Sequence, residues 1–560
     1  MFRGERNEKI NAKTGRGVVA LFTNVAGAYS YRFACKIICR GYSLWGCTSH
    51  HEEWRQYIES SVCLAKNSLK VWVKQDKIKG LNRRYQTIRC QGNMDRVEVW
   101  LNEAGRPGVS AVRDLCGRKE SAMKTVLAYY DIYPKVLCTG YPAEITISPL
   151  SRHVDFTETI PYRIRIFSMY ETLLNSPEDS EPVVQAEYKD GKLHFCYHFA
   201  TEQPYELLLE EKCDDEWRQR CELRVYALEP DLFALRPYRG DMHCHTCCSD
   251  GRESPDFVAA QYRKAGFDFL SITDHGQYEP SLKAIQTYES CNLSFRLFPG
   301  EEVHPPHNNI HTVHFGGDYS INDIFRNHPE QYAEEVHKIA ESLDTPAGIN
   351  KGEYASLLWV YDHIRAAGGL AVMVHPCWIQ DHAFHVQNAM YRYLLEKKPF
   401  DALELTCGQS LEENQAQISV WQQMREEGHA VPIVGDNDSH GTINSDWFGI
   451  SKMIVLAAAC EKDALIEAVR ARHTVVLEQY HGEPLPRLYG ENRAVEFVLF
   501  LVTEYMPLHD ELCYEEGRLM MEFANGSDEA GKALQVIGRR CDQLLEKYWW
   551  QNSRENRSTS

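Results

Sequence analysis

The chain has 560 residues, of which 43% are hydrophobic and 25% are charged, and its formal net charge is −18. This composition is typical of a globular protein and argues against wholesale disorder, while the length predicts two to four domains of roughly 100–200 residues each. No stretch approaches the ~20 apolar residues that span a bilayer, which predicts that the protein does not enter a membrane.

The charge divides the chain near residue 122. Residues 1–122 carry 22 Lys and Arg against 11 Asp and Glu, whereas the remaining residues carry 39 against 68. Such asymmetry predicts a domain boundary. We interpret residues 1–122 as a basic N-terminal extension that is poorly ordered or not part of the functional fold, because Met123 reads as a natural start and alternating strands follow it. The strongly acidic remainder disfavours long nucleic acids as partners, because it repels a polyanion.

Residues 123–235 predict an all-β accessory domain. Residues 143–147, 162–166 and 193–197 alternate apolar and polar side chains, and Asp190-Gly191 predicts a tight hairpin turn. Strands at short intervals favour an immunoglobulin-like β-sandwich. We expect an accessory role in substrate access or dimerisation, although the sequence leaves the oligomeric state open.

Residues 236–480 alternate strand-like and helix-like segments, which favours an α/β barrel. Helices are predicted over 256–265, 356–367 and 412–427, and the long stretch 321–353 between them is expected to form a lid or specificity loop. Residues 481–560 predict a C-terminal strand and helix extension, with a strand at 495–500 and a helix at 530–548. The apolar runs of the barrel end in polar residues, which is where catalytic groups gather in such folds.

The most informative motif is Gly240-Asp241-Met242-His243-Cys244-His245, which continues to Ser249-Asp250-Gly251. In a β-strand His243 and His245 would share one face, and Asp250 could fold back over that face from the following turn. Neutral imidazoles and carboxylates are common ligands of divalent metals. Similar side chains end the later apolar runs, namely Asp274, His275, Glu301, Glu302, His311, His314, His375, Asp436, Asp438 and His440.

These motifs resemble those of the PHP (polymerase and histidinol phosphatase) superfamily, and most closely its CehA/McbA branch, over roughly residues 236–479. The resemblance implies a distorted (β/α)7 TIM-like barrel that holds two or three divalent ions. It implies that His243 and His245 bind one ion with Asp438, and that Glu302 bridges to a second ion held by His311 and His375. Asp250, His275 and His440 would complete a third site. The expected catalytic set is His243, His245, Glu302, His375, Asp438 and His440.

Several assignments stay open at this point. Glu301 competes with the adjacent Glu302, Asp436 competes with Asp438, and His311 competes with His304, His307 and His314. Asp274 either orients a metal-bound imidazole or caps the following segment. The proton donor to the leaving group is also open among His304, His307, His314 and His382.

The predicted function is a metal-dependent hydrolase that uses metal-activated water on a small-molecule ester, and a phosphate ester is the first choice. A carboxylic-ester or carbamate hydrolase of the CehA/McbA type is the alternative, and a catalytically silent metal-binding module is the alternative from another class. Mixed imidazole and carboxylate ligands without a committed thiolate accept Zn, Mn or Fe. A cytoplasmic location is expected, because Cys244, Cys247, Cys248 and Cys377 lie near proposed ligands and would oxidise readily elsewhere.

Overall fold

The computed structural model describes residues 129–172, 181–443, 445 and 447–551, together with the backbone of six strands in the first 128 residues. The chain divides into two compact units, Met1–Lys124 and Thr125–Ser560. The strands of the first unit form two antiparallel sheets, β1 (Val18–Gly27), β2 (Ser30–Cys39) and β3 (Tyr42–Thr48), and β4 (Lys70–Lys77), β5 (Arg84–Gly92) and β6 (Met94–Leu101). The expectations for the order and the role of residues 1–122 otherwise lie outside the described residues.

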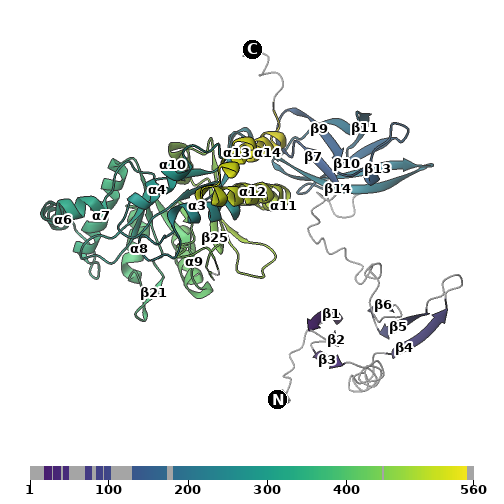
Figure 1. Ribbon diagram of the computed structural model, residues 1–560, viewed down its shortest axis with the longest axis horizontal. Coiled ribbons are helices and arrows are strands. Elements are labelled where there is room, and N and C mark those ends of the chain that lie inside the picture. Colours follow the sequence, from purple (N-terminus) through teal and green to yellow (C-terminus); the bar gives the residue numbers. More distant parts are fainter. Residues whose placement is uncertain are drawn as a thin grey trace, which may run out of the picture. The chain divides into compact units, whose positions relative to one another are not determined.

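The second unit begins with one continuous sheet of eight strands in the order β7-β9-β12-β11-β10-β13-β14-β8 (Figure 1). The strands are β7 (Tyr130–Tyr133), β8 (Val136–Cys138), β9 (Pro142–Pro149), β10 (Tyr162–Ser168), β11 (Val183–Lys189), β12 (Lys192–His198), β13 (Gln203–Cys213) and β14 (Glu216–Leu228). They include the three strands that alternation predicts. Asp190 and Gly191 have φ of 50° and 78°, as the expected hairpin turn requires.

The sheet curls instead of forming two separate sheets as in the expected sandwich. The first half of β11 pairs with β10 and its second half pairs with β12, so this strand passes from one side of the curl to the other. The buried side chains of the two sides meet in one core, which includes Ile145, Ile164 and Leu207. The alternation of side chains predicts which face is buried, but it does not reveal which strands are neighbours.

Two mixed sheets follow. The first has the order β17-β16-β15-β25-β26-β27 and the second has the order β18-β19-β20-β23-β24. The strands are β15 (Arg236–Asp241), β16 (Phe269–Ser271), β17 (Arg296–Phe298), β18 (Gly300–Val303), β19 (Thr312–Phe315), β20 (Leu370–Met373), β23 (Ala402–Thr406), β24 (Ile433–Gly435), β25 (Ser451–Ala457), β26 (Thr474–Glu478) and β27 (Arg487–Tyr489), and β21 (Ile379–Gln380) and β22 (Ala383–Phe384) form a separate hairpin.

The two mixed sheets agree with the expected α/β class, but they do not by themselves show the distorted (β/α)7 TIM-like barrel that the resemblance implies. Parallel pairing is confined to β15-β16-β17 and β20-β23-β24, and the other pairs within these sheets are antiparallel. Isolated parallel bridges, Cys244↔Ser439 and His275↔Glu302, connect one sheet to the other. The architecture is therefore a mixed α/β fold with a curled eight-stranded sheet.

Helices are interleaved with these strands and continue to the C-terminal end of the described chain. They are α2 (Pro230–Phe233), α3 (Pro255–Lys264), α4 (Glu279–Tyr288), α5 (Asn322–Asn327), α6 (Pro329–Ser342), α7 (Lys351–Ala366), α8 (Asn388–Lys397), α9 (Leu411–Glu426), α10 (Lys462–Arg470), α11 (Asn492–Glu504), α12 (Met506–Ala524), α13 (Asp528–Ile537) and α14 (Arg540–Tyr548). Within the described residues, none of these helices combines the length and the apolar character that a membrane crossing requires.

Two of the expected segments differ from the structure, and a third contains helices. The stretch 321–353, which is expected to form a lid or specificity loop, contains α5 and α6, and α7 begins at Lys351 because the Asn350 side chain caps it. The strand expected at 495–500 is part of α11, since a short apolar run does not distinguish a buried helix from a strand. The helix expected at 530–548 is divided into α13 and α14.

The C-terminal helices join the curled sheet to the α/β part (Figure 1). Side chains of β8 and β14 share one hydrophobic core with side chains of β25, β26, α11 and the end of the chain. Lys135 Nζ lies 3.1 Å from Glu504 Oε2, and this ion pair is buried. Trp549 forms a parallel bridge with Val136, so residues 548–550 lie along the outer edge of β8.

The contact between α12 and α3 depends on Gly517. A Cβ atom at this position would lie 2.3 Å from the backbone nitrogen of Lys264, which is closer than non-bonded atoms can approach. We expect Gly517→Ala to lower the free energy of unfolding by about 1–3 kcal/mol, because the two helices must separate. Urea denaturation would measure this. Gly352→Ala in α7 is the matched control, because its Cβ would meet only Asn350 Oδ1 at 3.4 Å, and a gain of up to about 1 kcal/mol is expected there.

Candidate metal centre

Seven of the nine predicted ligands follow the carboxyl ends of strands in the two mixed sheets, whereas Glu302 lies within β18 and His311 precedes β19. β15 ends at Asp241, so His243 and His245 lie just beyond the strand and not within it. The segment is nevertheless held in place, because Asp438 N donates to His243 O at 2.9 Å and His245 N donates to Ser439 O at 2.9 Å. This pairing brings the His-x-His motif beside the Asp438-Ser439-His440 motif.

Glu302 lies at the centre of the cluster and its side chain is fully buried. Glu302 Oε1 lies 2.9 Å from His311 Nδ1, 3.2 Å from His375 Nε2 and 3.7 Å from His243 Nε2. The other oxygen, Oε2, contacts His275 Nδ1 and lies 3.7 Å from His245 Nε2. One carboxylate from β18 therefore faces five of the predicted imidazoles.

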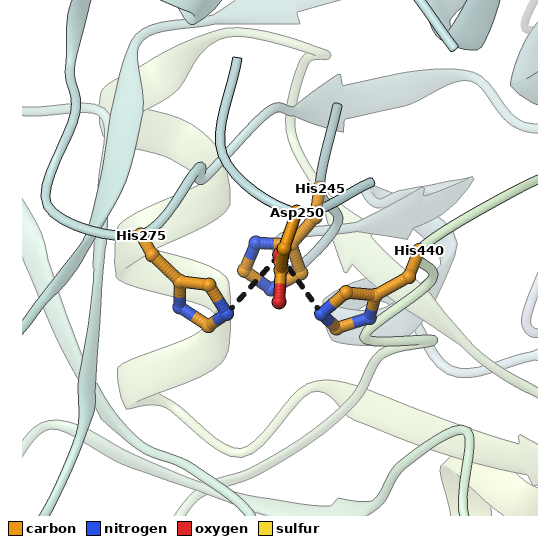
Figure 2. Close-up of side chains that lie close together, drawn as sticks. All are labelled: His245, Asp250, His275 and His440. Atoms are coloured by element: carbon orange, nitrogen blue, oxygen red, sulfur yellow. Dashed lines mark ion pairs between the residues drawn. The ribbon is translucent and has the colours of Figure 1, made fainter. Parts of the chain in front are cut away.

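Asp250 lies between His275 and His440 and forms an ion pair with each, as Figure 2 shows. Its Oδ1 lies 3.4 Å from His275 Nε2 and 3.2 Å from His440 Nε2, and 58% of its side chain is exposed. His245, Asp250, His275 and His440 offer ligand atoms that all lie within 4.8 Å of one another. Two other such groups are His243 with Glu302 and His375, and His311 with His375 and His385.

Asp438 connects the buried and the exposed parts of the cluster. Its Oδ1 lies 2.8 Å from His245 Nε2, 3.3 Å from His243 Nε2 and 3.8 Å from His440 Nδ1. The structure thus brings all nine predicted side chains together, namely His243, His245, Asp250, His275, Glu302, His311, His375, Asp438 and His440. Their role as metal ligands remains a prediction.

Two of the competing residues, Glu301 and His314, face away from this cluster, whereas His304 lies within it. Glu301 alternates to the opposite face of β18, where its carboxylate accepts hydrogen bonds from Ser320 Oγ at 2.7 Å and Asn322 Nδ2 at 2.9 Å. His314 Nδ1 lies 3.3 Å from the same carboxylate. His311 precedes β19 instead of lying in it. The geometry therefore favours Glu302 and His311 over Glu301 and His314.

The two other carboxylates are also placed. Asp436 Oδ1 accepts a hydrogen bond from Met242 N at 2.6 Å, which ties β24 to β15. Asp274 accepts hydrogen bonds from Thr246 N at 2.8 Å and Thr246 Oγ1 at 2.7 Å. It holds the turn that carries Asp250, so neither of the two predicted roles of Asp274 is found.

The sequence reasoning did not assign a role to Glu404 or His385. Glu404 Oε1 lies 2.8 Å from His243 Nδ1, and Glu404 Oε2 accepts a hydrogen bond from His375 N at 2.8 Å. The sequence signal available for Glu404 was an acidic residue within the apolar run that forms β23, and the structure shows that this residue is buried. His385, which follows β22, lies with its ring centroid 4.7 Å from that of His311. No sequence signal marks it, because a hairpin brings it to the site. His304 also lies in the cluster, whereas His382 is exposed.

Glu404 is expected to orient His243, because a carboxylate on the far nitrogen of an imidazole fixes its tautomer and raises its basicity as a ligand. Glu404→Gln keeps the shape but weakens this interaction. We expect metal affinity to fall by about 10–100-fold, with little change in the fold. Competition with a chromogenic chelator would measure the affinity, and unchanged binding would remove Glu404 from this role.

The protonation states of the buried imidazoles and carboxylates favour the binding of cations. Burial lowers the pKa of His311 to about 4 and that of His385 to about 3, which favours neutral imidazole, the form that binds metals. Burial would raise the pKa of Glu302, but the surrounding imidazoles hold it well below its ordinary value. Burial would likewise lower the pKa of His243, but Asp438 and Glu404 raise it well above its ordinary value, so a proton takes the place that a cation could fill.

Several buried atoms of the cluster lack a hydrogen bond of acceptable geometry. They include His243 Nε2, His245 Nε2, Glu302 Oε2 and Asp438 Oδ1. Leaving such atoms unpaired is costly in a protein interior, and these four converge on one another. A divalent cation among them would satisfy nitrogen and oxygen lone pairs together, so the donor set fits a metal.

Comparisons with known proteins give limited similarity. No family model matches the chain. The DNA polymerase/3′-5′ exonuclease PolX of Bacillus subtilis is 29% identical over 94 residues, which are 15% of this chain and 16% of that protein. The chain therefore covers about a sixth of the length of this relative.

Solved structures with a similar chain course include three bacterial proteins. A two-domain protein of Bacteroides vulgatus, described as containing a predicted PHP-like metal-dependent phosphoesterase, is 16% identical, with 43% of this chain and 65% of that chain covered and a TM-score of 0.32. A protein of Bifidobacterium adolescentis described as a metal-dependent phosphoesterase is 18% identical over 36% and 88% of the two chains, with a TM-score of 0.27. An amidohydrolase of Chromobacterium violaceum with bound sulfate is 16% identical over 36% and 87%, with a TM-score of 0.25. Similarity at this level does not establish a shared function.

Proposed function

We propose that the protein is a metal-dependent hydrolase that acts on a small phosphate ester. The observation that carries this proposal is the position of Glu302, a fully buried carboxylate that faces five imidazoles and lies beside Asp438. Buried charges are normally paired or bound to metal. A cluster that concentrates so many ligand atoms around one carboxylate is best explained by bound cations.

The residues divide into three groups of ligands. His243 and His245 would hold one ion with Asp438, His311 and His375 would hold a second ion with Glu302 as the bridge, and Asp250, His275 and His440 would hold a third at the exposed end. Bound divalent ions supply Lewis acidity and lower the pKa of a water ligand from near 16 to about 7. The exposure of Asp250 and His440 places the solvent-facing side of the cluster where a substrate can approach.

The chain's own side chains set the charge that a substrate meets. Asp250, Glu302 and Asp438 would neutralise only part of the positive charge of the bound ions. The site would therefore still attract an anionic ester. His304 has a side chain that is 35% exposed and lies at the open end of the cluster beside His275, which makes it the best placed of the four proton-donor candidates. A cytoplasmic location, the choice among Zn, Mn and Fe, and membership of the PHP superfamily with its (β/α)7 barrel are parts of the same proposal.

The competing functions make different demands. A carboxylic-ester or carbamate hydrolase would use the same ions but a substrate of lower charge, so the site alone does not exclude it. A silent metal-binding module would bind ions and turn over nothing. An inactive relative of an enzyme usually loses some of its metal ligands. All nine ligand positions here carry side chains able to bind a metal, so we expect the site to be active.

The test is a substrate screen on purified protein whose metal content has been measured. Phosphomonoesters, phosphodiesters, carboxylic esters and carbamates are assayed with the wild type, His243→Ala and Asp438→Ala. Each variant is expected to lose metal and turnover while keeping its circular-dichroism spectrum. His337→Ala is the control, because that side chain is 72% exposed on α6 and should change nothing.

The outcomes separate the readings. Turnover of phosphate esters supports the proposal, whereas selective turnover of carbamates or carboxylic esters favours the alternative. Metal binding without turnover of any class favours the silent module. Full activity in Asp438→Ala would contradict the proposed ligand set.

A further inference from the structure

A second group of ligand-type side chains lies at the opposite end of β16 from the candidate metal centre. His509 and Cys513 lie one turn apart on α12, Cys541 lies on α14, and Asp268 precedes β16. All four residues are at least 90% buried. His275 follows the carboxyl end of β16, so the two clusters belong to different ends of this strand.

The distances among the two sulfurs and the imidazole of this group are those of a tetrahedral zinc site. Cys513 Sγ lies 3.7 Å from Cys541 Sγ and 3.5 Å from His509 Nε2. Zinc bound to sulfur at about 2.3 Å and to nitrogen at about 2.0–2.1 Å in a tetrahedron separates two sulfurs by about 3.8 Å and a sulfur from a nitrogen by about 3.5 Å. Asp268 Oδ1 lies 2.7 Å from His509 Nε2, which is a hydrogen-bond distance, and 3.0 Å from Arg263 Nη1, so this carboxylate would become the fourth ligand only by giving up its hydrogen bond to His509.

The surroundings supply partners for such ligands. Arg263 is fully buried and its Nη2 lies 3.1 Å from Cys541 Sγ, as in the N–H···S contacts that stabilise a metal-bound thiolate. His509 Nδ1 lies 3.4 Å from Asp510 Oδ1, and a carboxylate on the far nitrogen directs the other nitrogen toward a metal. Asp510 is itself paired with Arg239 Nη1 at 2.8 Å.

A cavity gives access from outside. Its volume is about 230 Å³, and its lining includes Asp268, His509 and Cys541 together with Cys460. The cavity therefore leads to three of the four proposed ligand residues. A metal site needs such a route as well as suitable ligands.

We propose that His509, Cys513, Cys541 and Asp268 form a closed structural site for a thiophilic divalent cation, for which zinc is the expected ion. Four protein ligands leave no open position, so this site does not take part in hydrolysis. Its role is to hold α12 and α14 to the amino end of β16. The ion would connect the C-terminal helices, which also contact the curled sheet, to the strand that leads into the candidate metal centre.

Cobalt substitution tests this site separately from the candidate metal centre, whose proposed ligands include no thiolate. The full chain is loaded with Co²⁺ and examined for a thiolate-to-cobalt charge-transfer band in the near ultraviolet. We expect the wild type to show the band and Cys541→Ser to lose it, together with one equivalent of zinc by elemental analysis. Cys460→Ser and Cys407→Ser are matched controls that should keep both, because Cys460 lines the same cavity and Cys407 lies near His243.

A second variant covers a failure of Cys541→Ser to fold. Cys541→His replaces one zinc ligand by another, so it should retain the equivalent of zinc and show a weaker band. The proposal is overturned if cobalt-loaded wild type shows no band, or if Cys541→Ser keeps as much zinc as the wild type. Either result would favour a metal-free network in which protonated His509, Arg263 and Arg239 balance Asp268, Glu516 and Asp510. A purified chain that lacks this zinc and in which peptide mapping finds a Cys513–Cys541 disulfide would also overturn it, since the disulfide would then occupy the site.

Discussion

Replacing Glu302 by glutamine is expected to abolish hydrolysis and to release metal. The amide has the same shape but lacks the charge that faces five imidazoles, and it cannot bridge two cations through both oxygens. We expect kcat/KM to fall by at least about 1,000-fold, equivalent to about 4 kcal/mol of transition-state stabilisation. Steady-state kinetics with the best substrate of the screen and elemental analysis of the purified variant would measure both effects.

The adjacent acid provides the control for this experiment. Glu301→Gln makes the same chemical change one residue earlier, but Glu301 holds Ser320, Ile321 and Asn322 and does not contact the cluster. We expect a loss of about 1–3 kcal/mol in the free energy of unfolding, with metal content retained. If both variants lost metal equally, the assignment of Glu302 as the bridging ligand would be wrong.

Complete removal of metal is the second large expected effect. Exhaustive chelation should reduce turnover to background. None of the nine predicted ligands is an activated nucleophile, so without metal the ester would be attacked only by water that no ion activates. Adding back Zn²⁺, Mn²⁺ or Fe²⁺ one at a time should restore activity to different extents and identify the productive ion. Initial rates before chelation, after it and after each addition are the measurement.

The control for chelation is the fold itself. The near-ultraviolet circular-dichroism spectrum, which reports the packing of aromatic side chains, should show whether the core that includes Trp359, Tyr361 and Trp421 survives metal removal. Activity that persists after complete chelation, with metal absent by elemental analysis, would reject metal-dependent hydrolysis altogether.

The candidate site could be predicted from the sequence in large part. Strand-like runs that end in His, Asp or Glu identify nine side chains that the structure brings together, because the carboxyl ends of several strands meet at one place. The sequence did not reveal on which face of its strand each side chain lies. Glu301 and Glu302 differ only in the alternation of β18, and a shift of one residue in register would exchange them.

The parts of the site that could not be predicted depend on distant packing. His385 reaches the cluster through the β21-β22 hairpin, and Glu404 reaches it from the middle of β23, so neither follows a strand end in the pattern that marks the others. The fold shows the same limit. Periodicity identified most strands. It could not reveal that β11 pairs with β10 in its first half and with β12 in its second half, or that residues 495–500 belong to α11.

The pairing of Trp549 with Val136 has a consequence for the colloidal behaviour of the protein. β8 is the outermost strand of its sheet, and an uncovered outer strand offers free backbone groups on which other chains can assemble into fibres or amorphous precipitate. Residues 548–550 pair with the backbone groups of β8, with Lys135 N donating to Tyr548 O at 2.8 Å and Trp550 N donating to Val136 O at 2.9 Å. A truncation that removed these last residues would therefore do more than loosen the helices, since it would leave a template for self-association.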